Sequence, residues 1–332
     1  MKVLMIGGTG VISTEVSKRF LALGYDLYLL NRGTQTHGIC PEGAKVIYCD
    51  IRDEAASVKA LEGKSFDVVV DWISYTPEQL EQTLRIFRGK YDQFIFISSC
   101  AVYTRGLRNA AEDAPKENMA WDYARNKLGC EEYLKIEDIM YGCKWTVVRP
   151  AVTYGDTRIP CAIIPARQWT LADRMLHGKP IVMHDDGSAV TGITHSSDFA
   201  KGLVGLAGNP KAYRQAFHLL SDEYLSWKEM AEIEAETLGV KPNFVFIPSV
   251  DICRTHTQTQ QGVTYGVLLC NKAHTNTYDT TKIKAAVPEF VCTTPFREGI
   301  RRTMEFYQTH EAYRLIDEAW NAEMDMLCKK FG

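Results

Sequence analysis

Tyr123 and Lys127 stand four residues apart in "WDYARNK" (121–127), a stretch with a helical pattern. Residues at this spacing lie on one face of a helix, so the two side chains would be neighbours. An ammonium beside a phenol stabilises the phenolate and lowers the tyrosine pKa toward neutrality, as acid/base catalysis requires. The same spacing is also common on solvated helix faces. A catalytic role therefore depends on what surrounds the pair.

A serine that suits the same chemistry ends the fifth predicted strand. In "FISSCAVY", Ser99 follows a buried apolar run, at the edge where open α/β sheets bind ligands. Its hydroxyl could hydrogen-bond the substrate oxygen that Tyr123 protonates. The adjacent Ser98 is the alternative.

A glycine-rich turn opens the chain. "VLMIGGTGVIS" places Gly7 and Gly10 directly after a strand and at the head of an apolar-periodic helix. Gly7 permits a tight turn, and Gly10 lets the backbone approach a pyrophosphate at the helix N-terminus. Ser13 takes the third position and is small enough for close helix–sheet packing. Because a strand precedes the turn and a helix follows it, we predict a dinucleotide-binding site rather than a structural turn.

The end of the second predicted strand bears on which dinucleotide is bound. An NAD site normally carries an acid there, which holds the ribose 2′-hydroxyl. Here "LYLLNRG" places Asn31 and Arg32 at that point. A guanidinium suits a 2′-phosphate, which favours NADP over NAD. Alternatively, Arg32 stacks on the adenine or points to solvent.

Short apolar runs alternate with amphipathic stretches through the first half of the sequence, the pattern of βαβ units. We predict an α/β fold of the Rossmann type, a doubly wound parallel sheet, with a smaller C-terminal substrate-binding domain. The predicted strands are 2–6, 26–30, 45–48, 67–73, 93–98 and 144–149. The predicted helices are 11–23, 54–62, 76–88, 122–140 and, in the tail, 311–328.

We predict an approximate domain boundary after Arg149-Pro150, where the alternation of apolar runs and amphipathic stretches becomes less regular. We assign residues 1–150 to the dinucleotide-binding domain and 151–332 mainly to the substrate-binding region. Later segments are expected to return to the first domain.

Composition excludes several classes of protein. The 332 residues carry a formal net charge of −3, so no basic field favours nucleic acid or a membrane surface. No apolar run is long enough for a bilayer, and "MKVLMIGG" reaches its glycines too early for a signal peptide. The ten cysteines lack a framework spacing and are expected to be reduced thiols in the cytoplasm. The expected partner is a small-molecule substrate, with a possible homodimer and no metal.

As a set, these motifs resemble the extended branch of the short-chain dehydrogenase/reductase superfamily, which contains epimerases, dehydratases and reductases. The resemblance covers most of the length and is specific because the motifs keep their order. They are "GGTGVIS", "CDIRD" (49–53), "FISSCAVY", "YARNK", "RPAVTYG" (149–155), "DDGSAVTGITHSSDFAKGL" (185–203) and "TPFREGIRRTMEFY" (294–307).

The resemblance implies a catalytic trio. Ser99, favoured over Ser98 by the family register, would bind the reacting oxygen, and Tyr123 would be the acid/base. Lys127 would lower the Tyr123 pKa and hold the nicotinamide ribose. The implied cofactor-binding residues, of which Asp50 and Ile51 would flank the adenine, are Gly7, Thr9, Gly10, Val11, Ile12, Asn31, Arg32, Asp50, Ile51 and Lys127.

The sequence departs from relatives that act on nucleotide sugars. Val152 stands where an asparagine is common, and Thr191 where an arginine clamps the substrate phosphate. A diphosphate favours a bidentate guanidinium, so a nucleotide sugar is less expected here. Cys100 and Ala101 replace the Asp-Glu pair of sugar 4,6-dehydratases, so we set dehydration aside. The arginines that could compensate are Arg158, Arg167, Arg174 and Arg254.

The predicted function is an NAD(P)-dependent oxidoreductase or epimerase. Hydride transfer at a carbonyl or hydroxyl carbon of a small or sugar-like substrate would use Tyr123 as the acid/base. The alternative is a non-catalytic dinucleotide-binding regulator or an RNA-binding relative of the same fold. One such group is found in chloroplasts, and the strand end "NRG" of this sequence resembles it. The acidic net charge and the intact trio weigh against that alternative.

Two further clusters receive a structural interpretation. The pairs Cys253/His256 and Cys270/His274 loosely resemble zinc ligands, but their spacing fits no known finger. We predict ordinary thiols and surface histidines there. His184, His195 and Asp198 are likewise interpreted as structural.

Overall fold

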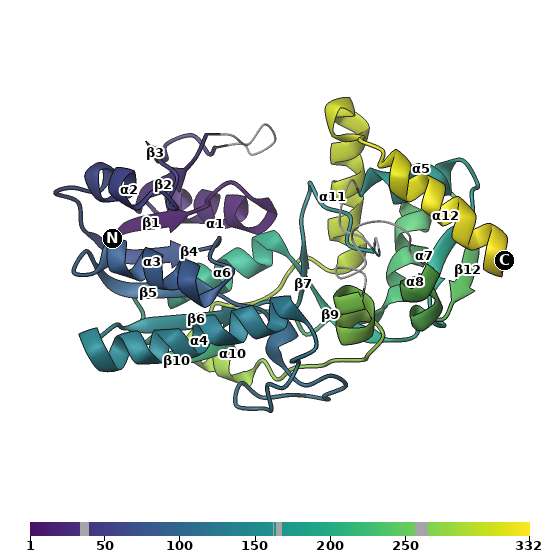
Figure 1. Cartoon of the computed structure of the whole chain (residues 1–332). Coiled ribbons are helices and arrows are strands. Elements are labelled where there is room, and N and C mark those ends of the chain that lie inside the picture. The colour runs from purple at the N-terminus through teal and green to yellow at the C-terminus, as the bar shows by residue number, and fades with distance from the viewer. Residues whose placement is uncertain (34–39, 162, 164–167, 256–264) are drawn as a thin grey trace.

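The computed structural model describes residues 1–33, 40–161, 163, 168–255 and 265–332. A seven-stranded sheet, parallel throughout, forms the larger half of the molecule, which we call the Rossmann half (Figure 1). Its strand order is β3-β2-β1-β4-β5-β6-β10, the doubly wound arrangement that reverses between β1 and β4. The predicted fold class is confirmed. The bounds are β1 Lys2–Ile6, β2 Asp26–Asn31, β3 Lys45–Tyr48, β4 Phe66–Asp71, β5 Tyr91–Ile97, β6 Trp145–Arg149 and β10 Gln215–His218.

Helices cover both faces of this sheet because its central strands are apolar on both sides. In β1, Val3 and Met5 pack into one hydrophobic layer, while Leu4 and Ile6 pack into the other. The first layer lies under α1 (Val11–Ala22) and α6 (Ser196–Leu206), and the second under α3 (Pro77–Phe87) and α4 (Asp122–Tyr141). The short α2 spans Glu54–Ala60.

The predicted strands and helices of the Rossmann half match the observed elements to within about two residues. The tail is different. Its predicted helix 311–328 begins only at α12 (Glu318–Phe331), after a short 3₁₀ turn over Glu311–Tyr313. Asp317 sets this start, because its carboxylate accepts a hydrogen bond from the Trp320 amide at 3.0 Å and caps the helix.

The second half of the molecule contains two small sheets packed among helices (Figure 1). The strands β7 (Val152–Tyr154), β9 (Val190–His195) and β11 (Tyr224–Ser226) form one sheet, and β8 (Ile181–His184) and β12 (Phe244–Ile247) form the other. Its helices are α5 (Trp169–Leu176), α7 (Trp227–Thr237), α8 (Ser249–Thr255), α11 (Phe296–Thr309) and α12, with a π-helix, η3, over Leu268–Lys272. Beyond residue 150, α6, β10 and α10 (Thr281–Ala286) belong to the Rossmann half.

A buried ion pair fixes α4 against the sheet. Glu131 of α4 and Arg149 of β6 are joined at 2.6 Å, and each side chain is only 4% exposed. Ser98, just after β5, donates to the same carboxylate at 2.6 Å. Because the three groups come from α4, β5 and β6, they hold the helix in one register over the strand ends.

Candidate functional site

The glycine-rich turn has the geometry that its residues predict. Gly7 has φ +86°, a conformation that favours glycine, and its amide donates to the Leu30 carbonyl at 3.2 Å. A Cβ on Gly7 would lie 2.5 Å from a methyl carbon of Ile73. Gly10 caps α1, so the positive end of the helix opens where the strand order reverses. This arrangement suits a pyrophosphate.

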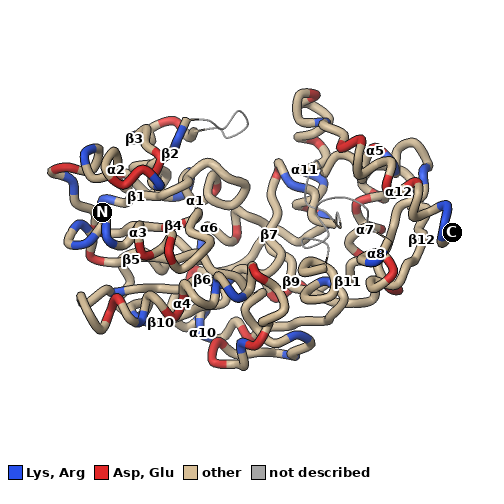
Figure 2. Tube along the Cα trace, viewed as in Figure 1, with Lys and Arg blue, Asp and Glu red and all other residues tan. Residues whose placement is uncertain are grey.

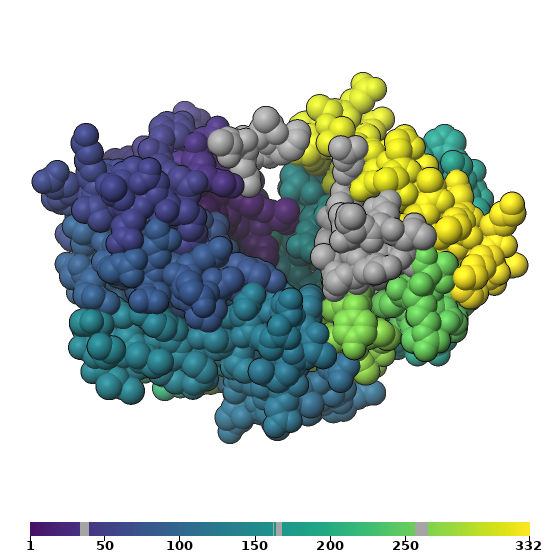
Figure 3. Space-filling model, in the orientation of Figure 1, coloured from purple at the N-terminus to yellow at the C-terminus, as the bar shows by residue number. Residues whose placement is uncertain are grey.

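A cavity of about 710 Å³ lies over this turn, within the roughly 300–1,000 Å³ typical of small-molecule sites. The space-filling view is hollowed between the two halves of the molecule (Figure 3). Nine of the ten predicted cofactor-binding residues line the cavity, and Lys127 does not. The nine are Gly7, Thr9, Gly10, Val11, Ile12, Asn31, Arg32, Asp50 and Ile51.

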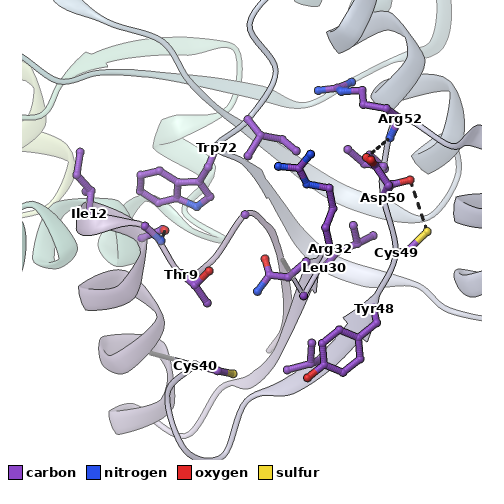
Figure 4. A pocket seen from close by; sticks show the side chains of 18 of the residues that line it. Thr9, Ile12, Leu30, Arg32, Cys40, Tyr48, Cys49, Asp50, Arg52 and Trp72 are labelled. Atoms are coloured by element: carbon purple, nitrogen blue, oxygen red, sulfur yellow. Dashed lines mark hydrogen bonds between the residues drawn. The ribbon is translucent and has the colours of Figure 1, made fainter. Parts of the chain in front are cut away.

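Sequence reasoning missed some side chains of this cavity, notably Tyr48 at the end of β3 and Trp72 just after β4. Figure 4 shows Trp72 beside Ile12, and Arg32 extending between Trp72 and Asp50 in this view. Ligands of parallel sheets bind outside the carboxyl ends of the strands. Inspecting the last residue of every predicted strand would have found Tyr48, whereas Trp72 lies inside the predicted strand 67–73 and follows only the observed end of β4 at Asp71.

Two arginines of the cavity differ in their bonding. Arg52 donates to the Gln79 carbonyl at 2.8 Å and to the Ser74 hydroxyl at 3.2 Å, so it forms part of the wall. No hydrogen bond or ion pair joins the Arg32 guanidinium to another described residue. Asn31 turns its side chain toward the glycine turn, where its carbonyl oxygen accepts from the Gly8 amide at 3.3 Å. Of these two arginines, Arg32 is the one that remains available to a ligand.

Ser99 and Tyr123 lie together beyond the end of β5. Ser99 begins a 3₁₀ turn, η1 (Cys100–Val102), and its hydroxyl accepts from the Ala101 amide at 3.1 Å. Burial raises the pKa of the Tyr123 phenol, while its hydrogen bond with Ser99 and the nearby Arg158 guanidinium lower that pKa. The half-buried phenol is thus held beside a hydroxyl and near a cation.

Lys127 lies one helical turn further along α4 and is 6% exposed. Its ammonium donates to the carbonyls of Ser74 and Ile97, each at 2.9 Å. Burial lowers the pKa of Lys127, and the nearby Asp71 opposes that effect. The Tyr123 ring lies 5.7 Å from the ring of Tyr75, so both α4 side chains face the segment that follows β4. An ammonium has three donors, so one remains for a ligand.

The structure separates the two adjacent serines. Ser98 is 2% exposed and its hydroxyl donates to Glu131, inside the buried network that anchors α4. Ser99 points the other way, toward Tyr123. These contacts place Ser99, not Ser98, beside the candidate acid/base.

The four arginines named as compensating cations have different surroundings. Arg174 is fully buried and paired with Asp325 at 2.7 Å, so it serves the fold. Arg254 is exposed on α8, and Arg167 lies outside the described residues. Arg158 lines the cofactor cavity. Of the three that the structure describes, Arg158 is the one placed near the candidate site.

The remaining predicted clusters have structural contacts. His195 caps α6, and the His184 ring contacts the Lys272 carbonyl at 3.2 Å. Asp198 accepts hydrogen bonds from the amides of Thr293 and Thr294. The ten cysteines are unpaired.

No group of three metal-ligating side chains occurs among the described residues, and His256 lies outside them. None of the helices in the described ranges combines the length and apolar character needed to cross a membrane.

A sequence model of the NAD dependent epimerase/dehydratase family matches residues 3–218. The chain therefore belongs to this family, and the predicted membership is confirmed.

Similar proteins include the chloroplast stem-loop binding protein of 41 kDa b from Arabidopsis thaliana, 28% identical over 72% of this chain. The chain spans 63% of that relative's length. Among solved structures, UDP-glucose 4-epimerase of Thermotoga maritima with UDP-glucose has a TM-score of 0.72 at 18% identity. The match covers 93% of this chain and 99% of the Thermotoga maritima chain. UDP-glucuronic acid 4-epimerase of Bacillus cereus, in complex with UDP-glucuronic acid and NAD, has a TM-score of 0.73 at 18% identity with the same coverage. The structural likenesses show a shared fold.

We expect Ser98→Ala and Ser99→Ala to differ in stability. Ser98→Ala removes a buried hydrogen bond to the ionised Glu131 carboxylate, so the free energy of unfolding should fall by about 1.5–3 kcal/mol. Ser99→Ala removes a local turn contact and the contact with the Tyr123 phenol, neither of which involves a charged group, and should cost about 1 kcal/mol. Urea denaturation of both variants measures the difference. Equal losses would contradict the separate roles.

Proposed function

We propose that this chain is an NAD(P)-dependent oxidoreductase or epimerase in which Tyr123 is the acid/base. The observation that carries the proposal is the contact between Ser99 and the half-buried Tyr123 phenol, with Lys127 one turn along the same helix. Lys127 bonds carbonyls just beyond β4 and at the end of β5, and Trp72 and Ile73, which precede Ser74, line the cavity that suits a dinucleotide. Family membership supports the same reaction class.

In this proposal the residues divide the work as follows. A bound nicotinamide would accept or donate the hydride. The Ser99 hydroxyl donates to the reacting oxygen of the substrate and fixes its position. The Tyr123 phenol gives a proton to that oxygen during reduction and removes it during oxidation. The free donor of Lys127 holds the nicotinamide ribose, and its charge favours the phenolate.

The substrate class is a small or sugar-like molecule with a carbonyl or secondary hydroxyl. Two solved relatives carry UDP-sugars according to their names. In this chain Val152 is half-buried at the start of β7 and Thr191 is buried in β9, and neither supplies a cation for a diphosphate. These two side chains favour a substrate without a nucleotide diphosphate. Reduction, oxidation and epimerisation share the same first hydride step.

We predict that Tyr123→Phe lowers kcat by about 100–10,000-fold, because general acid/base catalysis contributes that much and the ring shape is kept. A panel of aldehydes, keto-sugars and hydroxy compounds, followed by cofactor absorbance, measures the loss. Tyr75→Phe is the matched control, since its ring packs against Tyr123.

The pH profile is a second readout of the same variant. Burial raises the Tyr123 pKa, so wild-type reduction should persist through neutral pH, and oxidation should rise with pH as the phenol ionises. An unchanged rate in Tyr123→Phe would refute the assignment.

For the cofactor we propose NADP. No carboxylate ends β2, and the unpaired Arg32 extends into the cavity near Asp50 (Figure 4). A guanidinium there binds a 2′-phosphate with two charge-assisted hydrogen bonds. NAD remains the alternative, because the Bacillus cereus relative is named with NAD.

Arg32→Ala should weaken NADP binding by about 10–100-fold, the value of a charge-assisted contact, and leave NAD binding nearly unchanged. Isothermal titration calorimetry with both dinucleotides measures the two affinities. Arg301→Ala, which removes an exposed arginine paired with Glu298 and Glu305, controls for the change in net charge. Tighter binding of NAD than NADP by the wild type would reverse the assignment.

A stem-loop nucleic acid is the second candidate ligand, because the Arabidopsis relative is named for that activity. The charge distribution disfavours it. Lys and Arg alternate with Asp and Glu over both halves in Figure 2, and the net charge is −3. Phosphate-backbone binding needs a field of positive charge.

We therefore expect no shift of a stem-loop RNA in a mobility assay at about 150 mM salt, where phosphate contacts are already weakened. The same RNA without its loop is the control. Salt-dependent binding in the nanomolar range would favour the second candidate.

A further inference from the structure

Arg158 connects the second half of the molecule to the cofactor cavity. It follows β7 in a tight turn, in which its amide donates to the Gly155 carbonyl at 2.9 Å. Among the described residues that line the cavity, Arg158 alone comes from beyond residue 79. The turn therefore places a guanidinium opposite the wall that the Rossmann half supplies.

The bonding of Arg158 differs from that of the other buried arginines. Arg149 is paired with Glu131, and Arg174 with Asp325. No hydrogen bond or ion pair joins the Arg158 guanidinium to another described residue. Burial lowers the pKa of Arg158, and no carboxylate is among the groups that oppose this effect. A partly buried cation without an anion is costly, so the position favours an anionic ligand.

The neighbours of Arg158 show where that ligand would sit. Its charge lowers the pKa of the Tyr123 phenol and of the Tyr307 phenol. An anion bound by Arg158 would therefore lie near the Tyr123 phenol.

A second cation extends the same positive region. Lys272 is 8% exposed, with its ammonium 4.1 Å from the centre of the Trp227 ring. Burial and the Arg158 charge lower its pKa to about 8. Burial raises the pKa of the nearby Glu234 carboxyl. Arg158 and Lys272 are therefore close enough for each cation to disfavour the other.

We propose that the substrate carries an oxyanion group close to its reacting carbon, and that Arg158 binds this group beside Tyr123. The class is an acidic hydroxy or keto compound, with a carboxylate or a phosphate as the anion. The inference rests on the proposed function, because it names the substrate class of the same site. The alternative anion for Arg158 is the pyrophosphate of the cofactor, for which the glycine turn already provides a site.

Arg158→Gln tests the proposal by substrate discrimination. Glucose is compared with glucuronate and with glucose 6-phosphate, and the ratio of kcat/KM for the charged over the neutral compound is measured. The ratio should fall by about 10–100-fold in Arg158→Gln, the value of a lost charge-assisted contact, and by less in Arg158→Lys. The carboxylate and phosphate arms show which anion is bound. Arg301→Gln is the control for net charge.

A binding experiment does not depend on turnover. The cofactor-loaded wild type and Arg158→Gln are each titrated calorimetrically with glucuronate and with inorganic phosphate. At least one of the two anions should bind the wild type more tightly than it binds the variant. If neither does, the proposal is overturned. It is also overturned if Arg158→Gln loses NADP affinity, which assigns the guanidinium to the cofactor. Anion binding that depends on Arg158 without any turnover would retain this proposal and count against the catalytic one.

Discussion

The buried ammonium of Lys127 is the constraint on which the candidate site depends. A buried charge is costly unless every donor has a partner, and here the carbonyls of Ser74 and Ile97 take two of the three. These carbonyls follow β4 and β5, so the lysine ties α4 to the carboxyl edge of the sheet. Tyr123, one turn earlier, is thereby held at the same edge beside Ser99. One turn after Lys127, the ion pair between Glu131 of α4 and Arg149 of β6 fixes the same helix against the sheet.

The two halves of the molecule contribute different chemistry to the space between them. The Rossmann half supplies a helix N-terminus, a glycine turn and the residues that line the cavity, all of which suit a dinucleotide. The second half supplies Arg158 and Lys272, two cations whose charges influence each other. The Tyr123 phenol comes from α4 of the Rossmann half, and both burial and Arg158 influence its ionisation. Such a division lets one cofactor site serve different substrates, because the substrate side can change independently.

Much of the Rossmann half could be predicted from sequence because its signals are local. Apolar runs identify buried strands, and Gly7 needs its positive φ whatever surrounds it. The choice between Ser98 and Ser99 came from family register alone, since the deciding partner, Glu131, is 33 residues away. The contacts of Arg158 and Trp72 could not be predicted, because they depend on how the second half packs against the first. The late start of α12 was missed because the capping role of Asp317 was overlooked.

The most direct measurement is a crystal structure of the protein with NADP bound. We expect the nicotinamide ribose within about 3 Å of the Lys127 ammonium, the distance of a hydrogen bond, and the nicotinamide ring at the end of the cavity nearest Tyr123. A bound cofactor whose ribose lies away from Lys127, with Tyr123 facing no part of the ring, would contradict the central claim.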